Sequence, residues 1–282
     1  YLCGGSSGRH ISLSGKEVPP VRKTCEGDMT MGNKAVLEVD DISKSFGGVV
    51  AVWEVSFHLQ EGELLGIIGP NGSGKTTLVN LLTGFVKPDS GKVTYLGKNI
   101  TGKMPYKIAE LGIARTFQMA KPFYKLPAYK NLIIPLYSPR VKKLTGGRYG
   151  KRDDVAIDLL EEVGFERDSF VPYKMASNLP HGYLKRLELA RCLSLRPDLI
   201  ILDELFSGMS MSEVASTLPI IERLSGEGLS IIMIEHRLRE LFRLANRILV
   251  LNFGRKIADG PPDEVMESDA VKAAYLGTEH GE

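Results

Sequence analysis

Eight consecutive residues in the first third of the chain have the types and spacing needed to hold a chain of phosphates. Residues 69–76 read Gly-Pro-Asn-Gly-Ser-Gly-Lys-Thr, which is a glycine, four further residues and then Gly-Lys-Thr. Glycines allow backbone N–H groups to curl around a phosphate, Lys75 supplies positive charge, and Thr76 offers a hydroxyl to Mg²⁺. The predicted nucleotide-binding residues here are Gly69, Pro70, Asn71, Gly72, Ser73, Gly74, Lys75, Thr76 and Thr77.

An ordinary glycine-rich turn before a helix is the alternative interpretation of this segment. Its flanks favour phosphate binding instead. A short apolar run of strand length, residues 63–68, precedes the glycines, and a helical pattern follows over residues 76–82 with Gly84 as its expected end. Because a phosphate loop lies between a strand and a helix, we expect ATP to bind here.

Two acidic residues directly follow a wholly apolar run in the second half of the chain. Asp203 and Glu204 come after residues 199–202. Nucleotide sites form at the carboxyl ends of buried parallel strands, so Asp203 is placed to hold Mg²⁺ and Glu204 to polarise an attacking water as a general base. An isolated Asp-Glu pair would more often be a solvated strand end, but the upstream phosphate loop favours the catalytic interpretation.

A histidine lies just beyond the next apolar run, residues 231–234. His236 should open onto the same edge of the sheet, where it can sense the terminal phosphate. Taken alone, a histidine after a strand is more often a surface or core residue, but its position relative to Lys75 and Asp203 favours a functional role. The predicted catalytic residues are therefore Lys75, Glu204 and His236.

The elements expected to position these residues make an α/β fold. Alternating apolar residues near the start predict an antiparallel β layer, and later wholly apolar runs separated by helices predict a buried parallel sheet. Residues 106–177 have a mainly helical pattern. The expected strands are residues 35–39, 53–59, 63–68, 92–96, 199–202 and 231–234 and a hairpin within 248–258, and the expected helices are residues 76–82, 187–195 and 213–224 and one from Asp263.

Composition excludes several classes of protein. The chain has 282 residues, 43% hydrophobic and 25% charged, which is enough to build a globular core. A net charge of +2 gives no argument for nucleic-acid binding, and no apolar run reaches the roughly 18 residues that a membrane span needs. Three cysteines form neither a disulfide framework nor a metal-ligand spacing and favour a reducing compartment.

The beginning of the chain differs from the rest. Residues 1–33 mix Gly, Ser, Pro and charged residues without helical or strand periodicity, so we expect a disordered leader or a wrongly assigned start. The chain begins at Tyr1, and Met29 or Met31 is the expected true start. Peptides from residues 1–23 in the mass spectrum of the native protein would contradict this.

Together these motifs resemble the nucleotide-binding subunits of ABC transporters, over nearly the whole chain from about Ala35. Residues 69–76 match the Walker A motif of that family, and residues 199–204 match Walker B. The resemblance implies one ATPase domain over residues 34–282. It would have a RecA-like core, an antiparallel β subdomain and an inserted helical subdomain at about residues 105–185.

The resemblance also assigns roles to three residues outside those motifs. Gln118, which ends Ala-Arg-Thr-Phe-Gln, corresponds to the Q-loop glutamine that touches Mg²⁺ and reports nucleotide occupancy to the membrane subunits. Phe46 corresponds to the aromatic residue that stacks on adenine, with a buried core aromatic as the equal alternative. His236 corresponds to the switch histidine. The implied metal-binding residues are Thr76, Gln118 and Asp203.

Within this family the chain is most similar to the ATP-binding subunits of branched-chain amino-acid importers. Gly-Ile-Ala-Arg-Thr-Phe-Gln at residues 112–118 is typical of them, as is Glu-Val at 264–265 followed by Ala-Tyr-Leu-Gly at 274–277. The resemblance implies a peripheral ATPase at the cytoplasmic face of the membrane, with ATP and Mg²⁺ as cofactors. A related importer subunit for urea or short amides stays open, because this subunit never touches the transported substrate.

The segment that corresponds to the family signature is altered. The usual Leu-Ser-Gly-Gly-Gln or Leu-Ser-Tyr-Gly-Gln/Glu is replaced by Leu-Pro-His-Gly-Tyr, and Leu205 and Ser210 also replace a usual proline and Asp or Asn. The missing serine hydroxyl bonds the γ-phosphate on the opposite subunit in the family, and Pro180 offers neither hydroxyl nor N–H. Gly182 can still present its N–H. The predicted signature residues are Leu179, Pro180, His181, Gly182 and Tyr183.

The expected partners follow from the same resemblance. A second ATPase subunit should close face to face on this one, with a heterodimer favoured over a homodimer, and closure should drive transmembrane permease subunits. An extracytoplasmic binding protein would act only indirectly. The rivals are a soluble ABC ATPase without a membrane partner, which usually carries two cassettes or a coiled-coil insert, and a non-catalytic regulator that clamps ATP, which the altered signature keeps open.

Overall fold

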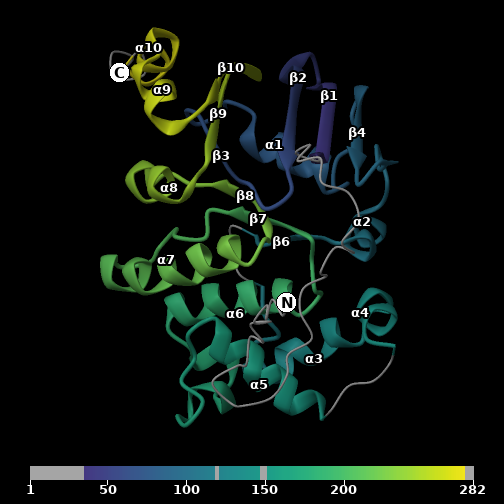
Figure 1. Cartoon of the computed structure of the whole chain (residues 1–282), viewed down its shortest axis with the longest axis vertical. Helices are drawn as coiled ribbons and strands as arrows, with labels where there is room; N and C mark the ends of the chain where they lie inside the picture. The colour runs from purple at the N-terminus through teal and green to yellow at the C-terminus, as the bar shows by residue number, and fades with distance from the viewer. Residues whose placement is uncertain (1–34, 118–120, 147–150, 277–282) are drawn as a thin grey trace, which may run out of the picture. The chain divides into compact units, whose positions relative to one another are not determined.

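The computed structural model describes residues 35–117, 121–146 and 151–276. The predicted leader, residues 1–33, lies outside these ranges. Figure 1 shows the described part as two sheets with helices packed against them.

The first strands form a four-stranded antiparallel sheet in the order β2-β1-β4-β5. β1 (Ala35–Phe46) and β2 (Val49–Gln60) make a long hairpin around a two-residue glycine turn. β4 (Ser90–Tyr95) pairs with β1, and β5 (Lys98–Asn99) pairs with β4. This sheet is the predicted antiparallel layer (Figure 1).

One residue of β2 lies on the opposite face from the one expected. The three alternating apolar residues that follow it are buried, but Trp53 is 38% exposed and Val52 is buried in its place. Glu54 has a φ of 46°, and the pairing between β1 and β2 is irregular at this point. A bulge of this kind shifts the side-chain alternation by one residue, which the sequence pattern does not reveal.

The second sheet has six strands in the order β10-β9-β3-β8-β7-β6. All neighbouring pairs are parallel except β9 and β10, which form an antiparallel hairpin. The carboxyl ends of β3, β7 and β8 therefore lie at one edge, as predicted. The strands are β3 (Leu64–Ile68), β6 (Ile113–Arg115), β7 (Leu199–Asp203), β8 (Ser230–Ile234), β9 (Arg247–Asn252) and β10 (Arg255–Gly260).

The sequence does not predict the edge strand β6, which lies inside the range expected to be mainly helical. It is only three residues long and pairs in parallel with β7. A strand this short shows no periodicity, so pairing with β7 determines its conformation. Its position brings Arg115 to the strand that carries Asp203.

Side chains of the parallel strands alternate between two hydrophobic cores. Leu65 and Ile67 of β3 pack with α1 (Lys75–Leu82) and the antiparallel sheet, whereas Leu64 and Ile68 face the core that contains residues of α6 (His181–Leu193) and of the helix that follows β7. Both faces of the sheet are buried. This explains why the central strands β3, β7 and β8 are almost wholly apolar.

Helices α3, α5 and α6 pack on one another on one side of the parallel sheet (Figure 1). α6 begins at His181, ahead of the predicted start at residue 187, because Pro180 begins its first turn and the apolar periodicity is visible only later. The remaining helices are α2 (Pro105–Leu111), α3 (Lys130–Leu136), α4 (Pro139–Leu144), α5 (Arg152–Glu162), α7 (Met211–Gly226), α8 (Leu238–Leu244), α9 (Pro262–Glu267) and α10 (Asp269–Leu276), with 3-10 turns η1 (Val171–Tyr173) and η2 (Ala176–Asn178).

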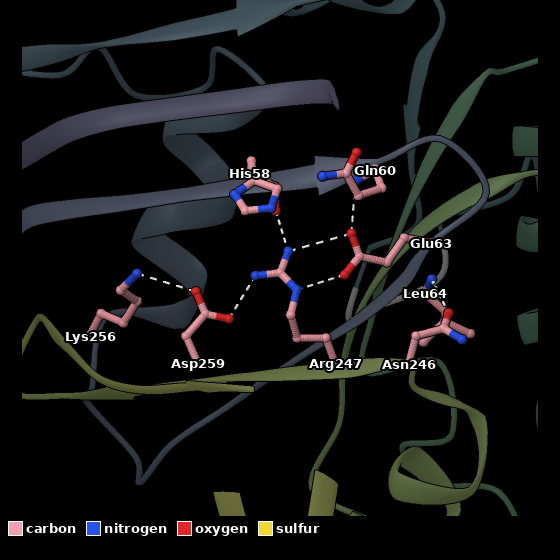
Figure 2. A network of polar contacts seen from close by, with 8 residues as sticks. All are labelled: His58, Gln60, Glu63, Leu64, Asn246, Arg247, Lys256 and Asp259. Carbon is pink, nitrogen blue, oxygen red and sulfur yellow. Dashed lines mark hydrogen bonds and ion pairs between the residues drawn. The ribbon is translucent and has the colours of Figure 1, made fainter. Parts of the chain in front are cut away.

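A polar network joins the two sheets at the start of β9 (Figure 2). Arg247 Nε donates to Glu63 Oε1 at 2.7 Å, and its Nη1 donates to Asp259 Oδ1 at 2.6 Å. A further hydrogen bond reaches the carbonyl oxygen of His58 on β2. Although burial opposes it, the Glu63 hydrogen bond and the Asp259 charge raise the pKa of Arg247. The guanidinium therefore ties together β2, the turn before β3, β9 and β10.

Candidate nucleotide-binding site

The glycine-rich loop joins β3 to α1, as the sequence predicts. Two of its glycines are required by space. A Cβ on Gly69 would lie 2.1 Å from the carbonyl oxygen of Leu251, and a Cβ on Gly74 would lie 2.4 Å from that of Ala51. Gly74 also has a φ of +103°. The loop thus passes directly against the backbones of β9 and β2.

This loop keeps polar groups that the protein itself does not satisfy. Ser73 is 2% exposed, and its Oγ has no hydrogen-bond partner among the described residues. The helix α1 begins at Lys75, and no side chain caps its N-terminus, so its first backbone N–H groups receive no hydrogen bond from a capping side chain. Buried polar groups without partners are rare in proteins. An anionic ligand with several oxygens, such as a nucleotide phosphate, fits this loop.

Lys75 lies inside the curve of the loop. The side chain is buried, and its Nζ donates to the carbonyl oxygens of Gly69 at 2.7 Å and Pro70 at 2.9 Å. Burial lowers the pKa of Lys75, while the charges of Glu204 and Asp203 oppose that change. The ammonium therefore has neutral carbonyl partners that phosphate oxygens can replace. Thr76 is exposed and Thr77 is half-buried in the first turn of α1.

Asp203 ends β7 and is buried beside an arginine. Arg115 Nη2 donates to Asp203 Oδ2 at 2.7 Å, and both side chains are more than nine-tenths buried. Arg115 Nη1 also donates to Asn80 Oδ1 at 2.7 Å, so it links the end of β7 to α1. The ion pair uses Oδ2 and leaves Oδ1 outside it. Arg115 is a site residue that sequence reasoning missed, because its strand β6 was not recognised.

Glu204 and His236 are brought together as the sequence predicts. Glu204 Oε1 lies 3.0 Å from His236 Nε2, and the Glu204 N–H donates to the carbonyl oxygen of Ile234 at 2.9 Å. Glu204 has a φ of 50°, a conformation that is unusual for a residue with a side chain and is found at functional sites. The carboxylate is 15% exposed and the imidazole 51%. Both groups can reach a ligand at the sheet edge.

Three charged side chains that were not predicted as site residues are buried beneath this site. Lys185 on α6 donates to the Glu204 carbonyl oxygen at 3.1 Å. Glu188, one turn later, accepts the Phe117 N–H at 2.7 Å, and Glu235 accepts the Phe206 N–H at 2.8 Å. Burial raises the pKa of Glu188 to about 6 and that of Glu235 to about 7, and it lowers the pKa of Lys185.

Comparison with known proteins shows which protein family has this site. The family model described as ABC transporter matches residues 52–207, and the model described as branched-chain amino acid ATP-binding cassette transporter matches residues 255–281. The chain belongs to the ABC transporter ATP-binding family. The predicted α/β fold and the predicted ABC-type ATP hydrolase are therefore confirmed, and cassettes of this family work as dimers with transmembrane subunits.

Individual relatives span most of this ABC ATPase. BraF of Pseudomonas aeruginosa, a high-affinity branched-chain amino acid transport ATP-binding protein, is 33% identical over 255 residues, which cover 87% of this chain and 99% of the relative. LptB of Haemophilus influenzae, a lipopolysaccharide export system ATP-binding protein, is 32% identical over 243 residues, covering 86% and 98%. The crystal structure of an ABC transporter cassette in its ADP conformation matches with a TM-score of 0.74 and 30% identity, covering 86% and 99%.

The segment predicted to be the signature of this ABC ATPase surrounds the start of α6. Pro180 is the N-cap residue, and α6 has no side-chain cap hydrogen bond. The sequence predicts that the Gly182 N–H remains available for the partner's phosphate. In the structure this N–H donates to the Glu213 carboxylate of α7. Two hydrogen bonds from Ser210 and this one from Gly182 lower the pKa of Glu213. His181 Nε2 lies 3.0 Å from the Ser207 carbonyl oxygen.

The remaining predicted site residues differ in how far they are exposed. Phe46 ends β1 with 48% of its surface exposed, and Lys44 Nζ lies 5.4 Å from its ring centre. The alternative of a buried core aromatic is therefore wrong for Phe46. Leu179 is buried and Tyr183 is half-buried, with its ring against Phe165. Gln118 lies outside the described residues.

Proposed function

We propose that this ABC ATPase powers the import of branched-chain amino acids. The match of residues 255–281 to the branched-chain model carries the proposal, because that segment lies beyond the shared cassette. Similarity to BraF supports it. Identity over the cassette does not choose the cargo, since the lipopolysaccharide-export relative is 32% identical. Export is therefore the second candidate, and a urea or amide importer is the third.

Transport by the assembled system tests the cargo. The source cell should lose uptake of radiolabelled leucine, isoleucine and valine when the gene is deleted. Uptake should return with the wild-type chain and not with Glu204→Gln. Unchanged uptake of all three amino acids, with loss of urea or acetamide uptake, would favour the third candidate. Unchanged uptake with a defect in surface lipopolysaccharide would favour export.

The chemistry proposed for the site is ATP + H₂O → ADP + phosphate. Glu204 accepts a proton from the attacking water, and His236 orients the Glu204 carboxylate. Lys75 exchanges the Gly69 and Pro70 carbonyls for phosphate oxygens, which gives the buried ammonium an anionic partner. Phe46 offers an exposed ring face to adenine.

The donor set is compatible with Mg²⁺. Among the described residues no three acidic, histidine or cysteine side chains form a ready metal site. Mg²⁺ is usually held by one or two carboxylates together with phosphate oxygens, so a single carboxylate suffices. Asp203, Thr76 and Gln118 would hold it. When bound, the ion neutralises charge on the phosphates.

The altered signature supports a heterodimer with unequal sites. Pro180 has no hydroxyl, and Glu213 places a negative charge against the Gly182 N–H. The site closed by this signature should hold ATP and turn over slowly. The site built from this chain's Lys75 and Glu204 with an intact partner signature should be fast.

Measurements on the assembled pair separate the two sites. Glu204→Gln in this chain should remove most ATPase activity, while the equivalent change in the partner should remove little. Pro180→Ser should bring the two losses closer together. Equal losses in the unmodified pair contradict unequal sites. The regulator alternative, a chain that clamps ATP without hydrolysing it, requires that the partner's glutamate alone carries turnover.

The proposed location is the cytoplasmic face of the membrane, where the chain binds permease subunits peripherally. Within the described ranges, no helix is long and apolar enough to cross a bilayer. An extracytoplasmic binding protein would deliver the substrate to the permease and not to this chain. Membrane fractionation with and without co-expressed permease tests this: the chain should sediment with membranes only when the permease is present.

A further inference from the structure

The last described helix reaches the phosphate loop. Tyr275, near the end of α10, lines a cavity of about 310 Å³ together with Gly69 and Pro70 of the loop and with His236. A hydrogen bond from the Gly69 backbone reaches the Tyr275 phenol. Burial raises the pKa of this phenol and the Gly69 bond lowers it. A hydrogen bond lowers the pKa of a phenol when it stabilises the phenolate, which requires that the phenol oxygen accepts the bond. The Gly69 N–H therefore donates to the Tyr275 phenol oxygen.

α10 is anchored well enough to hold this position. Val271 and Ala274 are buried, and Val271 belongs to the same hydrophobic core as residues of β3 and β8. Tyr275 is half-buried and packs against that core. The phenol is therefore held by a helix that packs on the core, and it can restrain the phosphate loop that it contacts.

Two side chains hold Gly69 from opposite ends of the residue. Tyr275 accepts its N–H, and Lys75 donates to its carbonyl oxygen at 2.7 Å. When Lys75 turns to phosphate oxygens, its bond to the Gly69 carbonyl is lost. The Tyr275 bond lies on the other side of the residue and does not compete with phosphate. It can therefore persist in the nucleotide-bound state.

We propose that Tyr275 is a positioning residue of the nucleotide site, which holds the first residue of the phosphate loop in its binding conformation from the C-terminal helix α10. This makes α10, which lies within the segment matched by the branched-chain model, part of the ATP site and not only an appendage of the cassette. The inference rests on the ATPase assignment and is independent of the transported substrate. Tyr275 does not touch the reacting atoms, so its loss should affect nucleotide affinity more than the chemical step.

The test is Tyr275→Phe in the full chain, which removes the hydroxyl and keeps the ring. MgADP affinity, measured by calorimetry, should fall roughly three- to tenfold, as expected for one neutral hydrogen bond. The KM for ATP should rise by a similar factor, with kcat changed less than about twofold. Exchange of the Gly69 amide hydrogen should become faster. Tyr173→Phe, which alters an exposed tyrosine on η1, is the matched control and should change none of these values.

The outcomes separate positioning from packing. A lower thermal midpoint with unchanged MgADP affinity and unchanged Gly69 exchange would show that Tyr275 only packs α10, and would overturn the proposal. A fall in kcat without a rise in KM would also overturn it. Tyr275→Leu provides a second variant that removes the hydroxyl and alters the cavity wall, and its affinity should be at least as low as that of Tyr275→Phe. Failure of wild-type ATP binding would instead contradict the proposed function itself.

Discussion

Two buried polar regions of this ABC ATPase differ in how well their charges are paired. At the start of β9, Arg247 finds carboxylates on two sides and a backbone carbonyl on a third (Figure 2). At the ends of β3 and β7, Lys75 faces neutral carbonyls and the Ser73 Oγ has no partner among the described residues. A satisfied network stabilises the fold, whereas an incompletely satisfied one retains capacity for a ligand.

The pKa shifts of the charged groups in the two regions show the same difference in pairing. Burial would lower the pKa of Arg247, but hydrogen bonds and opposite charges outweigh it and raise the pKa, so the guanidinium charge is well compensated. Beneath the nucleotide site, burial outweighs the available partners and raises the pKa of Glu188 and Glu235 while lowering that of Lys185. Perturbed carboxylates and lysines of this kind gather at functional sites. The following changes test whether the first region serves stability and the second serves activity.

Glu204→Gln should have the largest effect on activity. The amide keeps the shape and the contact with His236 but cannot accept a proton from water, so kcat should fall about 10²- to 10⁴-fold. MgATP binding should remain, and ATP should accumulate in a closed dimer detectable by size-exclusion chromatography. Turnover near the wild-type rate would remove Glu204 from the role of general base.

Arg247→Met should have the largest effect on stability. Removing the guanidinium leaves Glu63 and Asp259 without their main partner in a largely buried place, so the free energy of unfolding should fall by about 2–4 kcal/mol. The KM for ATP should not change. Arg243→Met, which breaks an exposed pair with Glu222, is the control and should cost about 0–1 kcal/mol in denaturant titrations.

Glu235→Gln should change how stability depends on pH. Burial raises the pKa of Glu235 to about 7, so the folded state binds its proton more tightly than the unfolded chain does. Stability should then fall as pH rises between about 5 and 7, by on the order of 2 kcal/mol from this group. The Gln variant should lose that part of the slope in denaturant titrations at several pH values. An unchanged slope would place the pKa near that of an exposed glutamate.

Glu213→Gln should have the smallest effect. It removes a negative charge from the Gly182 N–H while an amide oxygen can still accept hydrogen bonds from Ser210. In the assembled pair, the site closed by this signature should hydrolyse ATP about two- to fivefold faster, because the partner's phosphate no longer meets that charge. Single-turnover hydrolysis with Glu204→Gln in this chain isolates the site. No change would mean that Glu213 moves away on closure.

Local pattern was sufficient for the residues that lie in or beside regular elements. The glycine loop lies between a strand and a helix, and apolar runs place Glu204 and His236 at one sheet edge, so their meeting could be predicted. The position of Arg115 in the site could not be predicted, because the three residues of β6 show no periodicity and form a strand only by pairing with β7. The bulge at Glu54 that turned Trp53 outward was equally invisible.

Long-range contacts account for the remaining misses. Lys185 and Glu188 lie one turn apart on α6 among buried apolar residues, and their position on that face was a signal that could have marked them. Glu213 reaches Gly182 from another helix, and Tyr275 reaches Gly69 from the opposite end of the domain's sequence. No spacing rule connects residues that only the tertiary fold brings together.

We propose that the loop around Lys75 binds nucleotide phosphate and that the Arg247 network does not. Thermal unfolding of the wild type, Lys75→Ala and Arg247→Met with and without MgATP tests it most directly. MgATP should raise the midpoint of the wild type and of Arg247→Met by similar amounts, although Arg247→Met starts lower, and should leave Lys75→Ala almost unchanged, because a ligand stabilises only the state that binds it. An equal nucleotide-induced rise in Lys75→Ala would contradict the account.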